Sequence, residues 1–169
     1  MSYQQTFLAL GALILFSVTI LTVNRSLISH QEALLQTGAT NYALPLANGY
    51  LEEAQGKAFD KKFYGGAYSD TTDLTPTASL GPEMAEAYPQ FDDIDDFNGL
   101  EKTHPSTMHG SFTVKCRVGY VDPANLDVIV PQRTRLKRME VRVAGESLPD
   151  TLLLYTVFAA YRSSGVGGV

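Results

Sequence analysis

The chain has 169 residues, enough for one ordinary domain, and its composition is 44% hydrophobic and 18% charged. Its 13 basic and 18 acidic residues give a formal net charge of −5, which argues against a nucleic-acid-binding protein, because phosphate binding needs a basic face. The single cysteine, Cys116, excludes an intrachain disulfide framework and a zinc site of the CxxC type.

The N-terminal segment is apolar and free of charge. Residues 1–24 carry no charged side chain, and residues 7–23 would form a helix roughly 26 Å long, near the lower limit for crossing a bilayer. A cleaved signal peptide is a weaker alternative, because the segment has no basic start and no small-residue cleavage site follows it. One small domain could hardly cover a helix that is apolar on every face. We therefore expect residues 1–25 to pack in lipid or against other copies of the chain.

Residues 26–62 have the pattern of an amphipathic helix that continues the first segment. Apolar residues recur at a spacing of three to four, namely Leu27, Ile28, Leu34, Leu35, Tyr42, Leu46 and Leu51. Gly38 and Pro45 favour a kink or an unwound stretch around residues 37–48, because proline removes a backbone donor. We expect this helix to end near Lys62.

The remaining residues, 63–169, are expected to form a globular head that begins with an acidic loop. Nine of the 18 acidic residues lie between residues 63 and 101, where there is no Lys or Arg. Proline, glycine, serine and threonine recur there without apolar periodicity, which is typical of irregular surface chain. We therefore predict a loop over residues 63–110.

From residue 111 the apolar period becomes two, which predicts strands. We expect four antiparallel strands within residues 111–162, and a flexible tail over residues 163–169. The strand that begins at Thr151 is apolar on both faces, so both faces should be covered, one of them by the helix. The predicted fold class is α+β, a long N-terminal helix packed on a C-terminal antiparallel sheet of about four strands.

The densest polar motif is FDDIDDFNGL, at residues 91–100. An Asp-rich loop can supply the oxygen ligands that Ca²⁺ prefers, and Asp93, Asp95 and Asp96 are the candidate ligands. The spacing differs from that of an EF-hand, and the alternative is an Asp-capped turn that binds its own backbone. Beyond a possible Ca²⁺ we expect no cofactor.

We expect no catalytic residues and therefore no enzyme. His104, Ser106 and His109 share one loop, but no nucleophile elbow or oxyanion pattern accompanies them. Cys116 alternates with apolar neighbours, which indicates a small buried side chain.

Several segments together resemble type IV pilin-like proteins, notably minor pilins of the mannose-sensitive haemagglutinin type. They are the charge-free N-terminal helix, YLEEAQGKAFD, FDDIDDFNGL, LKRMEVRV and the final AAYR. The resemblance implies a subunit that the inner membrane holds before assembly and that then joins an extracellular filament at the cell surface. It also implies two partners: other copies of the chain, and the inner-membrane pilus assembly machinery with its separate ATPase.

In such a filament the apolar helices would form the core, and small side chains would allow close approach between them. The predicted assembly residues are Phe7, Leu8, Leu10, Gly11, Ala12, Leu13, Ile14, Leu15, Phe16, Val18, Ile20 and Leu21. The family carries a glutamate at the fifth mature position that neutralises a neighbour's amino terminus, whereas this chain has Gln5 if Met1 is the mature terminus. We expect Met1 and Gln5 to contact a neighbouring copy.

A head-to-tail stack is compatible with the charge distribution, since nine of the 13 basic residues lie from Lys102 onward and could meet the acidic loop of the next copy. An alternative from another class is a single-pass, membrane-anchored extracytoplasmic binding module whose acidic loop binds a cation.

Overall fold

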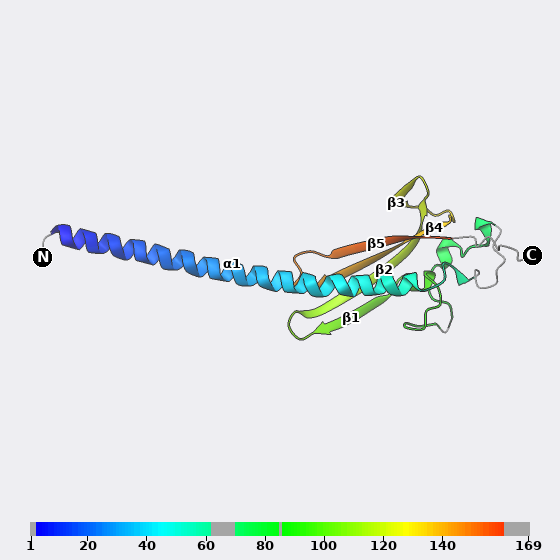
Figure 1. The fold of residues 1–169 in the computed structure, drawn as a ribbon, viewed down its shortest axis with the longest axis horizontal. Coiled ribbons are helices and arrows are strands. Elements are labelled where there is room, and N and C mark those ends of the chain that lie inside the picture. Colours follow the sequence, from blue (N-terminus) through cyan, green and yellow to red (C-terminus); the bar gives the residue numbers. More distant parts are fainter. Residues whose placement is uncertain (1–2, 62–69, 85, 161–169) are drawn as a thin grey trace, which may run out of the picture.

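The computed structural model describes residues 3–61, 70–84 and 86–160. One long helix, α1 (Tyr3–Gln55), packs its C-terminal part on an antiparallel sheet, and its N-terminal part projects far beyond the sheet (Figure 1). The five strands are β1 (Glu101–Ser106), β2 (Gly110–Asp122), β3 (Asn125–Ile129), β4 (Leu136–Gly145) and β5 (Leu152–Ala159). The sheet order is β1-β2-β4-β5, and β3 pairs with β2 off this path. This architecture confirms the predicted α+β class.

A stripe of alanines brings α1 close to the sheet. Ala39, Ala43 and Ala47 follow at intervals of four residues, and Ala54 continues the same face; all four are completely buried. Side chains this small let the helix backbone lie near the apolar face of the sheet. Because every buried residue of α1 lies at position 39 or later, residues 26–169 contain the whole core of the described chain.

Four large apolar side chains of the predicted amphipathic segment are not part of the buried core. Leu27, Ile28, Leu34 and Leu35 are all more than half exposed. The buried residues of α1 are instead Ala39, Ala43, Ala47, Tyr50, Leu51 and Ala54.

Pro45 does not interrupt α1, so of the two alternatives predicted around residues 37–48 the unwound stretch is wrong, and the kink stays a prediction. The helix is continuous through this region, and Pro45 lies on its exposed side, between Ala43 and Ala47 on the buried side. Packing of both alanines on the sheet holds the turns on either side of the missing backbone bond. The helix ends at Gln55, before Gly56, and not near Lys62.

The inward faces of β2 and β4 follow the predicted alternation. Phe112, Val114, Cys116, Val118 and Tyr120 of β2 are buried. So are Met139, Val141 and Val143 of β4, which lie in register with β2.

Two charged residues on the outer face of β4, opposite to Met139, Val141 and Val143, are covered. Arg138 and Glu140 are 9% and 5% exposed, and they form an ion pair with each other. Arg138 also donates to the Leu126 carbonyl of β3 at 3.2 Å and lies over the Tyr155 ring of β5. Neighbouring strands thus cover this part of the outer face.

The predicted acidic loop ends earlier than residue 110, because β1 (Glu101–Ser106) lies within it. This edge strand pairs with β2 from Glu101–Lys115 to Ser106–Gly110. Its sequence contains Pro105 and lacks apolar alternation, so the strand depends on backbone pairing with β2 and gives no periodic signal.

The prediction that both faces of β5 are covered is also wrong for the described residues. Leu153 and Tyr155 are 47% and 52% exposed on the face away from α1. The strand ends at Ala159, and the predicted tail over residues 163–169 lies outside the described residues.

Candidate assembly surface and acidic network

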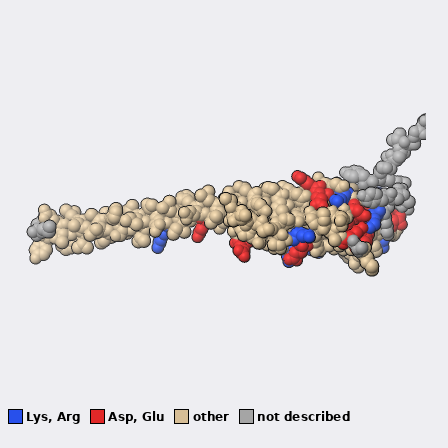
Figure 2. All heavy atoms as spheres, turned by 90° about the horizontal axis from the view of Figure 1, so that it is seen from below, with Lys and Arg blue, Asp and Glu red and all other residues tan. Residues whose placement is uncertain are grey.

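The projecting part of α1 offers a long apolar surface. Every residue from 3 to 37 is exposed, and the large side chains of the predicted assembly set are 50 to 74% exposed. Figure 2 shows that the charged side chains gather on the head, while the projecting helix is almost free of them. The structure thus displays Phe7, Leu8, Leu10, Gly11, Ala12, Leu13, Ile14, Leu15, Phe16, Val18, Ile20 and Leu21 on a surface that the head does not cover.

The polar groups within this segment are compatible with an apolar environment. The hydroxyl groups of Thr19 and Thr22 each donate to the backbone carbonyl four residues earlier, at 2.8 Å. Among the described residues, α1 is the one helix that is long and apolar enough to cross a membrane, with a mean hydropathy of 2.3 in its best window.

Gln5 lies at the exposed start of α1, and Met1 lies outside the described residues. Their predicted contact with a neighbouring copy stays a prediction.

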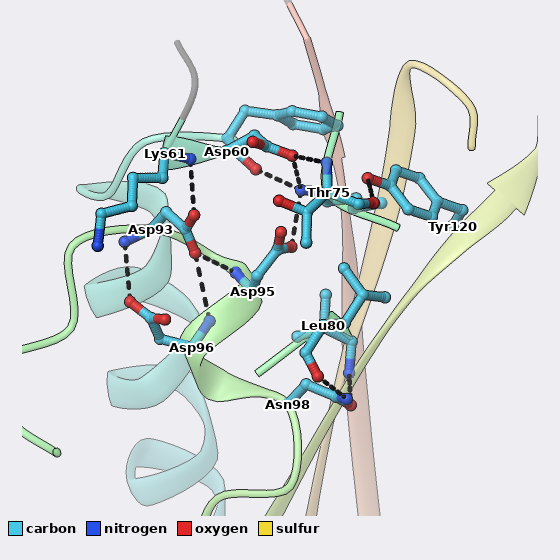
Figure 3. Close-up of polar contacts among 12 residues, drawn as sticks. Asp60, Lys61, Thr75, Leu80, Asp93, Asp95, Asp96, Asn98 and Tyr120 are labelled. Carbon is cyan, nitrogen blue, oxygen red and sulfur yellow. Dashed lines mark hydrogen bonds and ion pairs between the residues drawn. The ribbon is translucent and has the colours of Figure 1, made fainter. Parts of the chain in front are cut away.

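The Asp-rich motif forms a turn that binds its own backbone. One carboxylate oxygen of Asp93 accepts from the backbone N–H of Asp95 at 2.7 Å and of Asp96 at 3.3 Å, and the other accepts from the N–H of Lys61 at 2.7 Å (Figure 3). Asp96 in turn accepts from the N–H groups of Asp92 and Asp93. The Asp-capped turn, one of the two sequence-based alternatives, is confirmed.

A buried lysine stands beside this turn. Lys137 of β4 is completely buried, and its ammonium group lies 2.7 Å from Asp95 and 3.1 Å from Asp60. It also donates to the Phe59 carbonyl at 2.8 Å and lies over the aromatic rings of Phe59 and Tyr120. Lys137 thus joins the sheet to the segment that follows α1.

Burial shifts the ionisation of two of these carboxyl groups. It raises the pKa of Asp93 to about 7, with a further contribution from the charges of Asp95 and Asp96. Burial also raises the pKa of Asp95 to about 6, although the nearby Lys137 ammonium opposes this shift.

The three predicted Ca²⁺ ligands are divided between two clusters. Asp93 and Asp95 group with Asp60, while Asp96 groups with Glu83, Glu86 and Asp92, and in each cluster the candidate ligand atoms lie within 4.8 Å of one another. Each cluster already has a lysine: Lys137 in the first, and Lys61, at 2.7 Å from Glu86 and 3.2 Å from Glu83, in the second. A Ca²⁺ ion at Asp93, Asp95 and Asp96 stays a prediction.

His104 of β1, His109 and Cys116 have structural contacts. His104 Nε2 lies 2.8 Å from the Tyr50 hydroxyl of α1, and the His109 ring lies so close to Gly38 that a Cβ there would be 2.8 Å from it. Both histidines therefore hold the β1–β2 hairpin against the helix. Cys116 is buried, as predicted, and burial raises its thiol pKa to about 12.

Sequence reasoning missed Asp60 and Lys137. A usable signal existed for Lys137, because it shares the alternation of Met139, Val141 and Val143 and so lies on the inward face of β4. A charge on that face requires a buried partner. The residues around Asp60 show no periodic pattern that would predict its burial or its pairing with Lys137.

Comparisons of the chain with protein-family models, with curated proteins and with solved structures gave no match. The class is therefore defined by architecture alone: a long apolar N-terminal helix packed on an antiparallel sheet, which is consistent with a pilin-like protein.

Proposed function

We propose that this chain is a structural, non-enzymatic subunit of an extracellular type IV pilus-like helical filament. In this proposal the membrane holds the apolar helix before assembly, the inner-membrane pilus machinery extracts it, and other copies then surround it. The observation that carries the proposal is the exposed helix surface of residues 3–37, which is free of charge through Asn24.

Small side chains on this surface support the proposal. An apolar helix gains little hydrophobic free energy when it exchanges lipid for another helix, so close packing has to supply much of the association free energy. Ala9, Gly11, Ala12 and Ser17 offer such close approach, and a Cβ at Gly11 would meet nothing within 4 Å in the isolated chain.

Gly11→Phe tests this proposal against Gly11→Ala. Because space around Gly11 is open within one chain, we expect both variants to insert in the membrane and to keep the folded head. We expect filaments from the Gly11→Ala chain and none from the Gly11→Phe chain, by negative-stain electron microscopy of native cells. Normal filaments from Gly11→Phe would refute packing at this position.

The purified wild-type chain tests the alternative of a membrane-anchored binding module. Long thin fibres would support the filament, whereas monodisperse detergent particles would support the anchored module and refute our proposal. Residues 26–169 serve as the control, because they contain the described core and should fold as a soluble monomer.

A further inference from the structure

The head has an open hollow beside the C-terminal part of α1. Its volume is about 300 Å³, and its lining includes Pro45, Gly49, Tyr50, Glu53, Tyr88 and His104. Sites for small ligands in proteins measure about 300 to 1,000 Å³, so this hollow has room for a small molecule. None of these residues belongs to the exposed apolar surface of residues 3–37.

Two residues that disfavour a helix stand on the side of the hollow that α1 forms. Pro45 removes a backbone donor, and glycine inside a helix is less favourable than alanine. A Cβ at Gly49 would meet no atom of the described chain within 4 Å, so close packing does not require a glycine there. The missing side chain at Gly49 instead keeps the hollow open.

Three aromatic rings form one wall of the hollow. The ring centroid of Tyr50 lies 5.8 Å from that of Tyr88 and 5.9 Å from that of His104. The Tyr50 hydroxyl lies 2.8 Å from His104 Nε2, and this contact holds the two rings in place. The face of an aromatic ring carries partial negative charge and attracts cations. The chain already shows this attraction at the same wall, because Lys102 Nζ lies 5.4 Å from the centroid of the Tyr88 ring.

A carboxylate stands next to this wall. Glu53 is partly buried, and its Oε2 accepts from the Tyr88 hydroxyl at 3.0 Å, which fixes its position. Within the described residues, no lysine or arginine forms an ion pair with Glu53. No lysine or arginine lines the hollow either. The negative charge of Glu53 is therefore held in place with no cation of the described chain paired to it.

These features determine the charge of a suitable ligand. An anion would meet the Glu53 carboxylate and the ring faces, and no basic side chain of the hollow would offset the repulsion. A neutral ligand would leave Glu53 without a counter-charge. An ammonium group is attracted both to the carboxylate and to the rings of Tyr50 and Tyr88.

We propose that this hollow binds a small organic cation, whose ammonium group is held by Glu53 and by the rings of Tyr50 and Tyr88. The site goes beyond the filament function proposed above, because it belongs to the head and uses no residue of the projecting helix. Its occupation does not require assembly.

Ligand-observed NMR of the full-length chain in maltoside micelles tests the proposal, with choline as the probe. Maltoside contains no ammonium group that would compete. We expect saturation transfer from the protein to the methyl protons of choline. The control ligand is the neutral isostere of choline, in which carbon replaces the nitrogen, and titration should show that it binds at least about tenfold more weakly. Equal binding of the two ligands, or no transfer to choline, would overturn the inference.

Glu53→Gln tests the role of the carboxylate. Glutamine keeps the shape of the side chain and an oxygen for the Tyr88 hydroxyl, but it removes the charge, so choline should bind at least about tenfold more weakly. Glu52→Gln is the matched control, because Glu52 is exposed and lies outside the hollow, and this variant should bind choline as the wild type does. Equal weakening by both substitutions would indicate attraction to the general surface charge and would refute the site.

Gly49→Leu tests the location. The leucine side chain should fill the hollow and abolish choline binding, and the melting temperature should not fall, because the space around Gly49 is open. Asn48→Leu adds a leucine at the preceding position, outside the hollow, and should leave binding unchanged. Binding of choline to Gly49→Leu at wild-type strength would show that the site lies elsewhere.

Failure of this inference differs from failure of the filament function. The Glu53→Gln measurement decides the inference even if Gly49→Leu proves unstable, because it leaves the helix residues around Gly49 unchanged. Filament formation is not a readout of any of these experiments, so a chain that binds choline but forms no filaments would refute the filament function alone.

Discussion

Lys137 places a positive charge in the interior of the head, where water cannot solvate it. Asp60, Asp95 and the Phe59 carbonyl surround its ammonium group, and this arrangement offsets part of the free energy lost on burial. Such a group contributes little net stability while it is paired, but the removal of one member leaves the other charges buried and uncompensated.

We therefore predict that Lys137→Met lowers the free energy of unfolding by about 3 to 5 kcal/mol, the cost of breaking a buried ion pair. Urea unfolding of residues 26–169 measures this change. Lys115→Met is the matched control, because Lys115 pairs with Glu101 at 3.0 Å on the surface, and its loss should cost less than about 1 kcal/mol. Equal effects of the two substitutions would contradict the assigned role of Lys137.

The raised pKa values of Asp93 and Asp95 predict a pH dependence of stability. In the unfolded chain the pKa of an aspartate is about 3.9. Between that pH and about 7, the folded state therefore binds more protons at these carboxyl groups than the unfolded state does. The free energy of unfolding should consequently rise as the pH falls from 7 toward 4.

Melting temperatures of residues 26–169 at pH 5 and pH 8 measure this effect, and the wild-type value should be higher at pH 5. Asp95→Asn removes one of the two titrating groups and should reduce the difference, while the exposed Asp150→Asn should leave it unchanged. A wild-type melting temperature that is higher at pH 8 would show that the buried carboxyl groups are not the dominant titrating groups.

At the scale of elements, α1 has two surfaces with different requirements. Its C-terminal part meets the sheet through alanines at positions 39, 43 and 47, which are completely buried. Its N-terminal part presents large side chains that nothing in the head covers. One continuous helix can serve both purposes because Pro45 lies on the exposed side.

Ala47→Leu should therefore destabilise residues 26–169 by about 1 to 3 kcal/mol, the usual cost of overpacking. Asn48→Leu adds a leucine at the next, exposed position and should change stability by less than about 0.5 kcal/mol. Chemical denaturation compares the two variants. A similar cost for both would mean that the helix does not approach the sheet as closely as the structure shows.

At the scale of the whole molecule, assembly and folding use separate residues. The described core lies between Ala39 and Val143, whereas the exposed apolar surface lies between residues 3 and 37. Gly11→Phe should therefore prevent assembly and leave the head folded. Lys137→Met should instead destabilise the head and leave the exposed apolar surface of residues 3–37 unchanged. Figure 2 shows the same division in the distribution of charge.

The sequence by itself determined the features that depend on local periodicity. The uniformly apolar residues 7–23 identify a helix that one small domain cannot cover on every face. The alternation from Phe112 to Tyr120 identifies a strand and its buried face. In both cases, neighbouring residues carry all the information that is needed.

Only the tertiary structure decided which surfaces meet. The choice of Ala43 over Leu35 as the buried face of α1 depends on how closely the sheet approaches, and β1 exists because β2 supplies backbone partners for it. The pairing of Lys137 with Asp60 joins residues 77 positions apart. Periodicity is a property of a segment, whereas contact distance and charge pairing are properties of two segments together, and only the folded chain brings those segments together.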